Sequence, residues 1–194
     1  MKKALLILIT LIVGFAQADA QLFKKKVIDQ KYLAGAVTEE NGHVVFSRTI
    51  SLPEGYDADQ AYQKSMNWIG AYYQNDNVLT RKNNNSNISE HLASAGIVEY
   101  LTFKKSALVL DRTQIIYMLD IATDGRQLNI KMYNITYFYD EEREKIHYAA
   151  ENIITDSKAI NKKGNGFIVE NGKFRMKTID KFEDICTSLS DYFK

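Results

Sequence analysis

The sequence has a single cysteine, Cys186, and a single proline, Pro53, among its 194 residues. One cysteine cannot form an intramolecular disulfide, so a disulfide-braced fold is excluded and stability must come from a hydrophobic core. Cys186 falls in the apolar stripe of a predicted helix, which favours a buried, inert thiol. Pro53 is expected to end a strand, because proline cannot donate a hydrogen bond to a β-ladder.

Neither sign of charge is in clear excess: 25 lysines and arginines stand against 24 aspartates and glutamates. Nucleic-acid-binding proteins carry a basic surplus that neutralises phosphates, so the balance argues against a nucleic-acid partner. The three histidines, His43, His91 and His147, fall in different predicted elements and lack the spacing of a metal motif. We therefore expect neither a metal nor another cofactor.

The sequence also lacks an apolar run of the roughly 20 residues that span a bilayer. Its longest such stretch, from Ala4 to Phe15, has 12 residues and follows two lysines. Basic residues, an apolar stretch and the small-residue pattern Ala18-Asp19-Ala20 are the order of a secretory signal peptide. We expect a signal peptide over residues 1–20 that is cleaved between Ala20 and Gln21, and a periplasmic or secreted protein; an uncleaved anchor is the alternative.

Cleavage would remove two lysines and one aspartate and leave 174 residues with 23 basic and 23 acidic side chains. That length suits one domain with a substantial core. Gln21 stands where a lipid-anchored protein has cysteine, so no stable membrane anchor is expected. Residues 21–31, which include Lys24-Lys25-Lys26, are predicted to form a flexible basic tail with at most a weak membrane contact, and residues 32–194 a single domain.

Turn and helix-cap patterns predict a hairpin and then a helix at the start of this domain. Apolar runs at residues 32–37 and 43–52 flank Asn41-Gly42, which tolerates positive φ, and together they predict a β-hairpin. Asp57, followed three residues later by Gln60, has the pattern of a capping box and predicts the start of a helix.

The most regular pattern lies in the middle of the chain. Runs rich in β-branched and aromatic residues at 97–104, 113–122 and 127–139 predict three strands, the last two joined at Asp124-Gly125. The apolar side of the last run changes along its length, which predicts a bulge near Asn134 or a strongly twisted strand.

The C-terminal part is less clearly patterned. Residues 146–154 are compatible with a strand or a loose edge, and residues 167–176 predict a small hairpin around Glu170-Asn171-Gly172. An amphipathic helix is expected from about Thr178 to the end. The order of hairpin, helix, consecutive strands and final helix indicates an α+β fold, an antiparallel sheet with helices on one face.

Candidate ligand contacts are Tyr133, Tyr137 and Tyr139, which the alternation of the last strand places on one face. Aromatic linings with few polar groups are typical of binding pockets, whereas packing in a sheet–helix core is the alternative. The sequence favours a noncatalytic domain that binds an envelope protein or a small apolar ligand. Two alternatives stay open: an unrecognised envelope hydrolase that uses His91 or His147, and an assembly subunit that uses an exposed strand edge.

Several short segments follow one another in a distinctive order: Tyr32 with Gly35-Ala36-Val37, Asn41-Gly42 before Val44-Val45-Phe46, Leu52-Pro53-Glu54-Gly55, and a helix centred on Trp68. In this order and spacing, over roughly Tyr32 to Tyr139, the chain resembles a family of exported bacterial proteins known only as a domain of unknown function with a TATA-binding-protein-like (TBP-like) fold. The resemblance implies a β-α-β4-α layout with a curved sheet. It implies no activity and no functional residue, and likeness to a DNA-binding fold does not transfer DNA binding.

Overall fold

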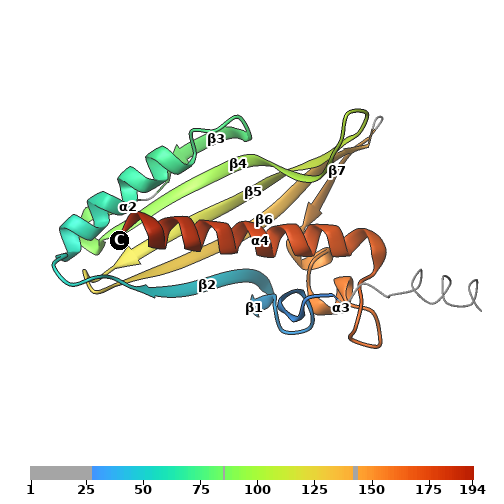
Figure 1. Cartoon of the computed structure of the whole chain (residues 1–194), viewed down its shortest axis with the longest axis horizontal. Coiled ribbons are helices and arrows are strands. Elements are labelled where there is room, and N and C mark those ends of the chain that lie inside the picture. The colour runs from blue at the N-terminus through green and yellow to red at the C-terminus, as the bar shows by residue number, and fades with distance from the viewer. Residues whose placement is uncertain (1–27, 85, 142–143) are drawn as a thin grey trace, which may run out of the picture.

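The computed structural model describes residues 28–84, 86–141 and 144–194. The predicted signal peptide and its cleavage site lie outside these residues. Seven strands form one curved antiparallel sheet with two long helices packed against it (Figure 1). The strands are β1 (Thr38–Glu40), β2 (His43–Ser51), β3 (Val78–Asn83), β4 (Leu92–Lys105), β5 (Leu110–Thr123), β6 (Gln127–Glu141) and β7 (Glu144–Ala149). The helices are α2 (Ala58–Tyr72), α3 (Asp156–Ala159) and α4 (Val169–Tyr192), with short 3-10 helices η1 (Gln30–Tyr32), η2 (Ile88–Glu90) and η3 (Ala150–Asn152).

Strand β6 pairs with two different strands along one edge. The strand order is β1-β2-β6-β5-β4-β3; β2 pairs with the first half of β6 up to Met132, and β7 pairs with the second half from Thr136. The pairing of β5 with β6 shifts register between these two points, and Asn134 has a φ of 53° there. The predicted bulge near Asn134 is therefore confirmed, and it separates the two halves of β6.

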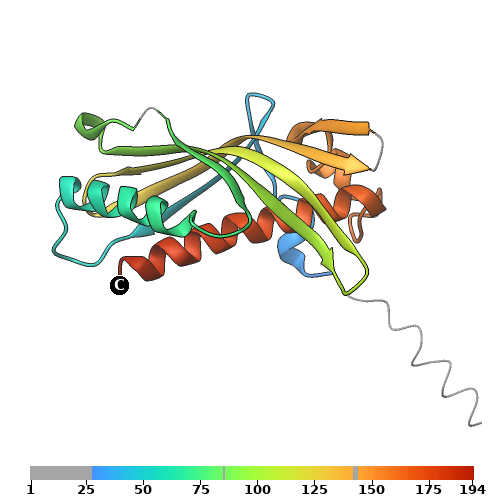
Figure 2. The same ribbon diagram turned by 90° about the horizontal axis from the view of Figure 1, so that it is seen from above.

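Burial alternates along β5. From Thr113 to Thr123 every second side chain is buried, and those between are only half-buried. Helices α2 and α4 both lie on the face that holds the buried set (Figure 2). This arrangement confirms the predicted antiparallel curved sheet with helices on one face, and it leaves the other face without either helix.

Helix α2 begins as predicted. The Asp57 carboxylate accepts a hydrogen bond from the Gln60 backbone N–H at 2.7 Å, and the Asp57 N–H donates to the Gln60 side chain at 3.2 Å. Trp68 is 2% exposed and its ring stacks on Tyr72 with 4.7 Å between centroids. The aromatic residues of this helix therefore pack in the sheet–helix interface.

Helix α4 begins at Val169, so the hairpin predicted at residues 167–176 is wrong and the helix starts earlier than Thr178. Gly172, interpreted as a turn residue, lies inside the helix against Phe167. A Cβ on Gly172 would lie 2.5 Å from the Phe167 Cβ, so glycine serves close packing there. Contacts outside the helix also hold this segment: Asn171 donates to the Lys158 carbonyl, and Arg175 donates to the Tyr32 carbonyl.

The strand predicted at residues 32–37 is also wrong. Residues Gln30–Tyr32 form η1, and β1 begins only at Thr38. The carbonyls of Tyr32 and Leu33 accept hydrogen bonds from Arg175 on α4, and Gly35 has a φ of 86°, so this segment does not join a ladder. The Asn41-Gly42 turn is confirmed, with both residues at positive φ.

Candidate functional site

The face of the sheet opposite α2 and α4 is called the open face below. Its apolar part is a set of half-buried or exposed side chains on three neighbouring strands: Val98, Tyr100, Ile116, Met118, Tyr133 and Phe138. Val98 lies opposite Ile116, Met118 opposite Tyr133, and Phe138 is 37% exposed. Because these pairs are adjacent across β4, β5 and β6, the side chains form one patch rather than scattered residues.

A hollow of about 380 Å³ borders this patch toward β2. Its outward-facing lining includes Ser47, Thr49, Asp120, Asn129 and Lys131. Thr49 donates to the Asn129 side-chain oxygen at 2.8 Å, and the Lys131 ammonium lies 2.8 Å from the Glu40 carboxylate. An apolar centre with a polar margin is the composition of a protein interaction surface.

Tyr133 is the only one of the three predicted ligand contacts on the open face. Its hydroxyl donates to the Asp120 carboxylate at 3.1 Å, and Ser94 donates to the other oxygen of Asp120 at 2.5 Å. Burial, followed by the negative charge of Asp120, raises the pKa of Tyr133. Ser94 is 3% exposed within β4, so the serine, the tyrosine and the carboxylate form one hydrogen-bonded group.

Tyr137 lies on the covered face, because the bulge at Asn134 reverses the side to which later residues of β6 point. Its side chain is fully buried, and its hydroxyl lies 2.7 Å from the Thr178 hydroxyl on α4. Burial raises the pKa of this phenol above its usual value. The ring packs edge-on against Phe174 at 5.1 Å, so Tyr137 fills the core instead of lining a pocket.

Tyr139, also on the covered side, belongs to a charged cluster at the start of α4. Its hydroxyl donates to Asp111 at 2.6 Å, and Lys173 lies 3.2 Å from the other oxygen of that carboxylate. Burial lowers the pKa of Lys173, but hydrogen bonds with Tyr139 and Asp111 outweigh it and raise the pKa to about 12. The aromatic pocket expected from the three tyrosines is therefore absent from the described structure, since they point to different faces and are already paired.

A buried ion pair lies in the core, and sequence reasoning missed it. Glu99 on β4 and Lys181 on α4 are 2.7 Å apart, with side chains 4% and 14% exposed. The Tyr117 hydroxyl donates to the other oxygen of Glu99 at 2.5 Å and lies 3.0 Å from the Tyr73 hydroxyl. Burial raises the pKa of both tyrosines well above the usual value. The sequence signal for this ion pair was Glu99 itself, an acidic residue on the apolar face of a strand.

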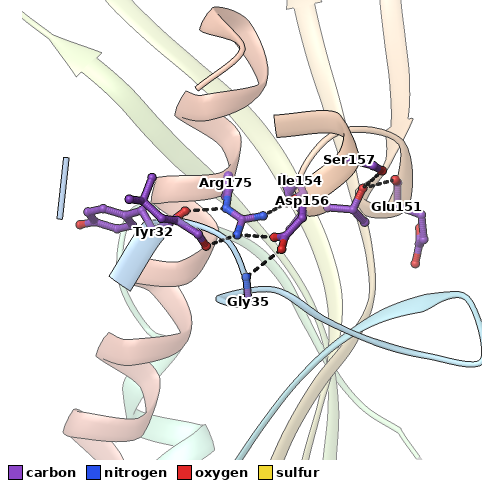
Figure 3. A network of polar contacts seen from close by, with 9 residues as sticks. Tyr32, Gly35, Glu151, Ile154, Asp156, Ser157 and Arg175 are labelled. Atoms are coloured by element: carbon purple, nitrogen blue, oxygen red, sulfur yellow. Dashed lines mark hydrogen bonds and ion pairs between the residues drawn. The ribbon is translucent and has the colours of Figure 1, made fainter. Parts of the chain in front are cut away.

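A second buried cation, Arg175 on α4, joins the N-terminal segment to the residues after β7 (Figure 3). Its side chain is 0% exposed, and the guanidinium donates to the carbonyls of Tyr32, Leu33 and Ile154 at 2.6–2.7 Å. It also donates to Asp156, whose second oxygen accepts from the Gly35 N–H. These contacts use four of the five N–H donors of the guanidinium and hold three distant segments together.

The titratable residues considered for catalysis are dispersed. His91 lies 3.0 Å from Asp59, while Ser94 bonds Asp120, so the histidine and the serine have different carboxylate partners. His147 stacks on Phe138 with 4.6 Å between ring centroids. Across residues 28–84, 86–141 and 144–194, no group of three or more His, Cys, Asp or Glu residues is placed to hold a metal ion. Cys186 is 1% exposed, as expected.

Comparison with known proteins finds a matching family model and similar crystal structures. The family model described as a domain of unknown function (DUF4468) with TBP-like fold matches residues 46–138. The crystal structure of a DUF4468 family protein from Bacteroides ovatus is similar at 29% identity and a TM-score of 0.76, over 87% of this chain and 96% of that one. A TBP-like protein from Parabacteroides distasonis, at 19% identity, has a TM-score of 0.57 over 80% of this chain and 95% of that chain, which shows the fold alone.

No curated protein matches the chain. Among the helices of the described residues, none combines the length and the apolar character that crossing a membrane requires. The family match and the two structures agree with the seven-stranded curved sheet and confirm the resemblance expected from the sequence. Residues 46–138 therefore match the family described as a domain of unknown function (DUF4468), and the described residues have its TBP-like fold.

Proposed function

We propose that this chain is an exported, noncatalytic binding domain of the bacterial cell envelope, and that it binds a partner protein through the open face of its sheet. The observation that carries the proposal is the apolar patch on that face. A single exposed apolar residue on a protein surface is ordinary, whereas a contiguous patch bordered by polar residues is typical of an interaction site.

The chemistry of the open face favours a protein partner over a small apolar ligand. The covered face, where an apolar ligand would fit, is filled by side chains such as Tyr137 and Phe174. The hollow on the open face is instead lined in part by charged and amide side chains, Asp120, Asn129 and Lys131, beside the apolar Leu92 and Ala122. A broad surface with a polar margin suits another protein surface.

Two other roles receive less support from the geometry. A hydrolase of the serine type needs a histidine within hydrogen-bond reach of the nucleophile, and Ser94 donates to Asp120 instead. Assembly through a strand edge could use β1, β3 or β7, which each pair with one strand. Charged residues on an edge, such as Arg81 and Lys82 on β3, oppose pairing with another chain.

Export is supported by the residue pattern of the first 20 positions. We expect the protein isolated from the periplasm or medium to begin at Gln21 and contain 174 of the 194 residues. Cell fractionation followed by intact-mass measurement tests this directly. A full-length chain that remains in the cytoplasmic fraction would contradict the location while leaving the binding proposal to its own test.

Site-specific photo-crosslinking in intact cells tests the binding face. A photoreactive residue in place of Met118 should give one discrete adduct with a second protein, and the same probe in place of the exposed Lys162 should not. Ile116→Lys, placed beside the probe, should abolish the adduct without lowering the melting temperature by more than a few degrees. Equal adducts at both probe positions, or none from Met118, would refute the proposed face. An adduct with a second copy through β3 would favour the assembly alternative.

A further inference from the structure

The hairpin between β4 and β5 ends in a row of exposed apolar side chains. Leu108 is 95% exposed, Val109 46% and Leu110 53%. Figures 1 and 2 show this tip at the same end of the molecule as the start of α4, and in Figure 2 it extends beyond the helices. Three consecutive exposed apolar residues at a protruding tip are unfavourable in water and call for a partner.

The tip has a defined backbone. The Ser106 N–H donates to the Val109 carbonyl at 2.8 Å, and the Val109 N–H donates to the Ser106 hydroxyl at 3.2 Å. Lys105 and Leu110 form the last pair of the ladder below it. Backbone groups that are already hydrogen-bonded can enter an environment of low polarity at a smaller cost than free ones.

The residues around the tip present positive charge. Lys104 and Lys105 precede it and Arg112 follows it, and all three are exposed. The nearby acidic residue, Asp111, is engaged at the base of the hairpin, where Lys173 lies 3.2 Å from one oxygen and Tyr139 donates to the other. The charge of Asp111 is therefore balanced by Lys173, while Lys104 and Lys105 are exposed and the Arg112 guanidinium lies over the Tyr100 ring, 3.6 Å from its centroid.

We infer that the β4–β5 tip inserts into the interface of a membrane that contains anionic lipids. The apolar side chains would occupy the boundary between headgroups and acyl chains, and the lysines would lie at the level of the phosphates. A membrane surface matches both features of the tip, because it offers an apolar layer directly below a negatively charged one. Three apolar side chains and three cations give reversible, peripheral binding. This site is separate from the open face and would keep that face near other envelope proteins.

Fluorescence of a labelled tip tests the insertion. Leu108→Cys in the full chain can be labelled with an environment-sensitive dye, because the native Cys186 is 1% exposed and burial raises its pKa to about 11. We expect brighter, blue-shifted emission with vesicles of phosphatidylcholine and phosphatidylglycerol, and little change with phosphatidylcholine alone. The matched control is Leu79→Cys on β3, where the native leucine is 44% exposed, and its emission should not change.

Substitutions give a second, label-free test by vesicle flotation. Leu108→Asp should weaken binding on the order of tenfold or more, whereas Leu79→Asp should have no effect. Lys104→Gln and Lys105→Gln should each weaken binding to the anionic vesicles about fivefold. Unchanged fluorescence of the native Trp68 serves as the check on folding. The inference is overturned if the unmodified chain does not bind anionic vesicles, or if Leu79→Asp weakens binding as much as Leu108→Asp; a tip that docks into a protein groove would give the first result.

Discussion

Replacement of Arg175 by methionine measures how far one buried guanidinium stabilises the fold. Methionine keeps the apolar stem but donates no hydrogen bond, so the carbonyls of Tyr32, Leu33 and Ile154 lose their donor. An unsatisfied buried acceptor costs about 1–3 kcal/mol. The Ile154 contact is buried and the other two are partly exposed, so we expect about 2 kcal/mol for the first and about 1 kcal/mol for each of the others. We add nothing for the bond to Asp156, because its side chain is 42% exposed and solvent screens the pair.

The expected loss of about 4 kcal/mol is a large share of the 5–15 kcal/mol by which domains are typically stable. Urea denaturation measures it, with fluorescence of Trp68 as the signal, because Trp68 is the only tryptophan in the sequence and is 2% exposed. Hydrogen exchange at the Gly35 N–H, which donates to Asp156 at 2.7 Å, reports separately on the N-terminal segment. In Arg175→Met this amide should exchange much faster than in the unmodified protein.

Arg48→Met is the matched control. Arg48 pairs with Glu183, but both side chains are about two-fifths exposed, at 40% and 43%, and such surface pairs contribute at most about 1 kcal/mol. The loss of stability in Arg175→Lys should lie between the losses in Arg175→Met and Arg48→Met, because an ammonium cannot replace the planar set of donors of a guanidinium. If Arg175→Met loses no more stability than Arg48→Met and Gly35 stays protected, the argument that the guanidinium holds the three segments together is refuted.

Three further predictions concern other parts of the fold. Lys181→Met should destabilise the domain by about 3–5 kcal/mol because it leaves Glu99 buried without its cation, whereas the double variant Glu99→Leu/Lys181→Met should recover most of that loss; equal urea midpoints for the two would contradict this. Asn134→Val should cost about 1–2 kcal/mol because Asn134 has a φ of 53°, while Asn134→Gly should be nearly neutral, and thermal melts of both variants provide the check. Burial raises the pKa of Cys186 to about 11 from an ordinary 9.0, so the unfolded state releases this proton first as pH rises. The contribution of this thiol to the free energy of unfolding should therefore be fully present below pH 9 and be lost between about pH 9 and 11. The free energy of unfolding should fall less over this range in Cys186→Ala than in the unmodified protein, and an equal fall in the two proteins would exclude the thiol as a cause.

Much of the architecture was predictable from short segments. Asn41-Gly42 and Asp124-Gly125 mark turns because their backbones adopt positive φ at Asn41, Gly42 and Gly125. Asp57 marks the start of α2 because its carboxylate accepts a hydrogen bond only three residues away. In each case the partner lies within a few residues, so composition and spacing carry the information. The face that the tyrosines occupy was harder to predict from the sequence, because a single bulge at Asn134 changes the face to which Tyr137 and Tyr139 point.

Local sequence was sufficient for the central strands, the antiparallel sheet, the capping box and the buried Cys186, because these depend on neighbouring residues and on the period of apolar positions. The tertiary structure was needed for the early start of α4, the 3-10 turn in place of a first strand, and the division of the tyrosines between two faces. Those features depend on partners far apart in the chain: Arg175 reaches back 143 residues to Tyr32, and Lys181 reaches 82 residues to Glu99. Such contacts form only when the sheet and helices are packed, so no local sequence pattern predicts them.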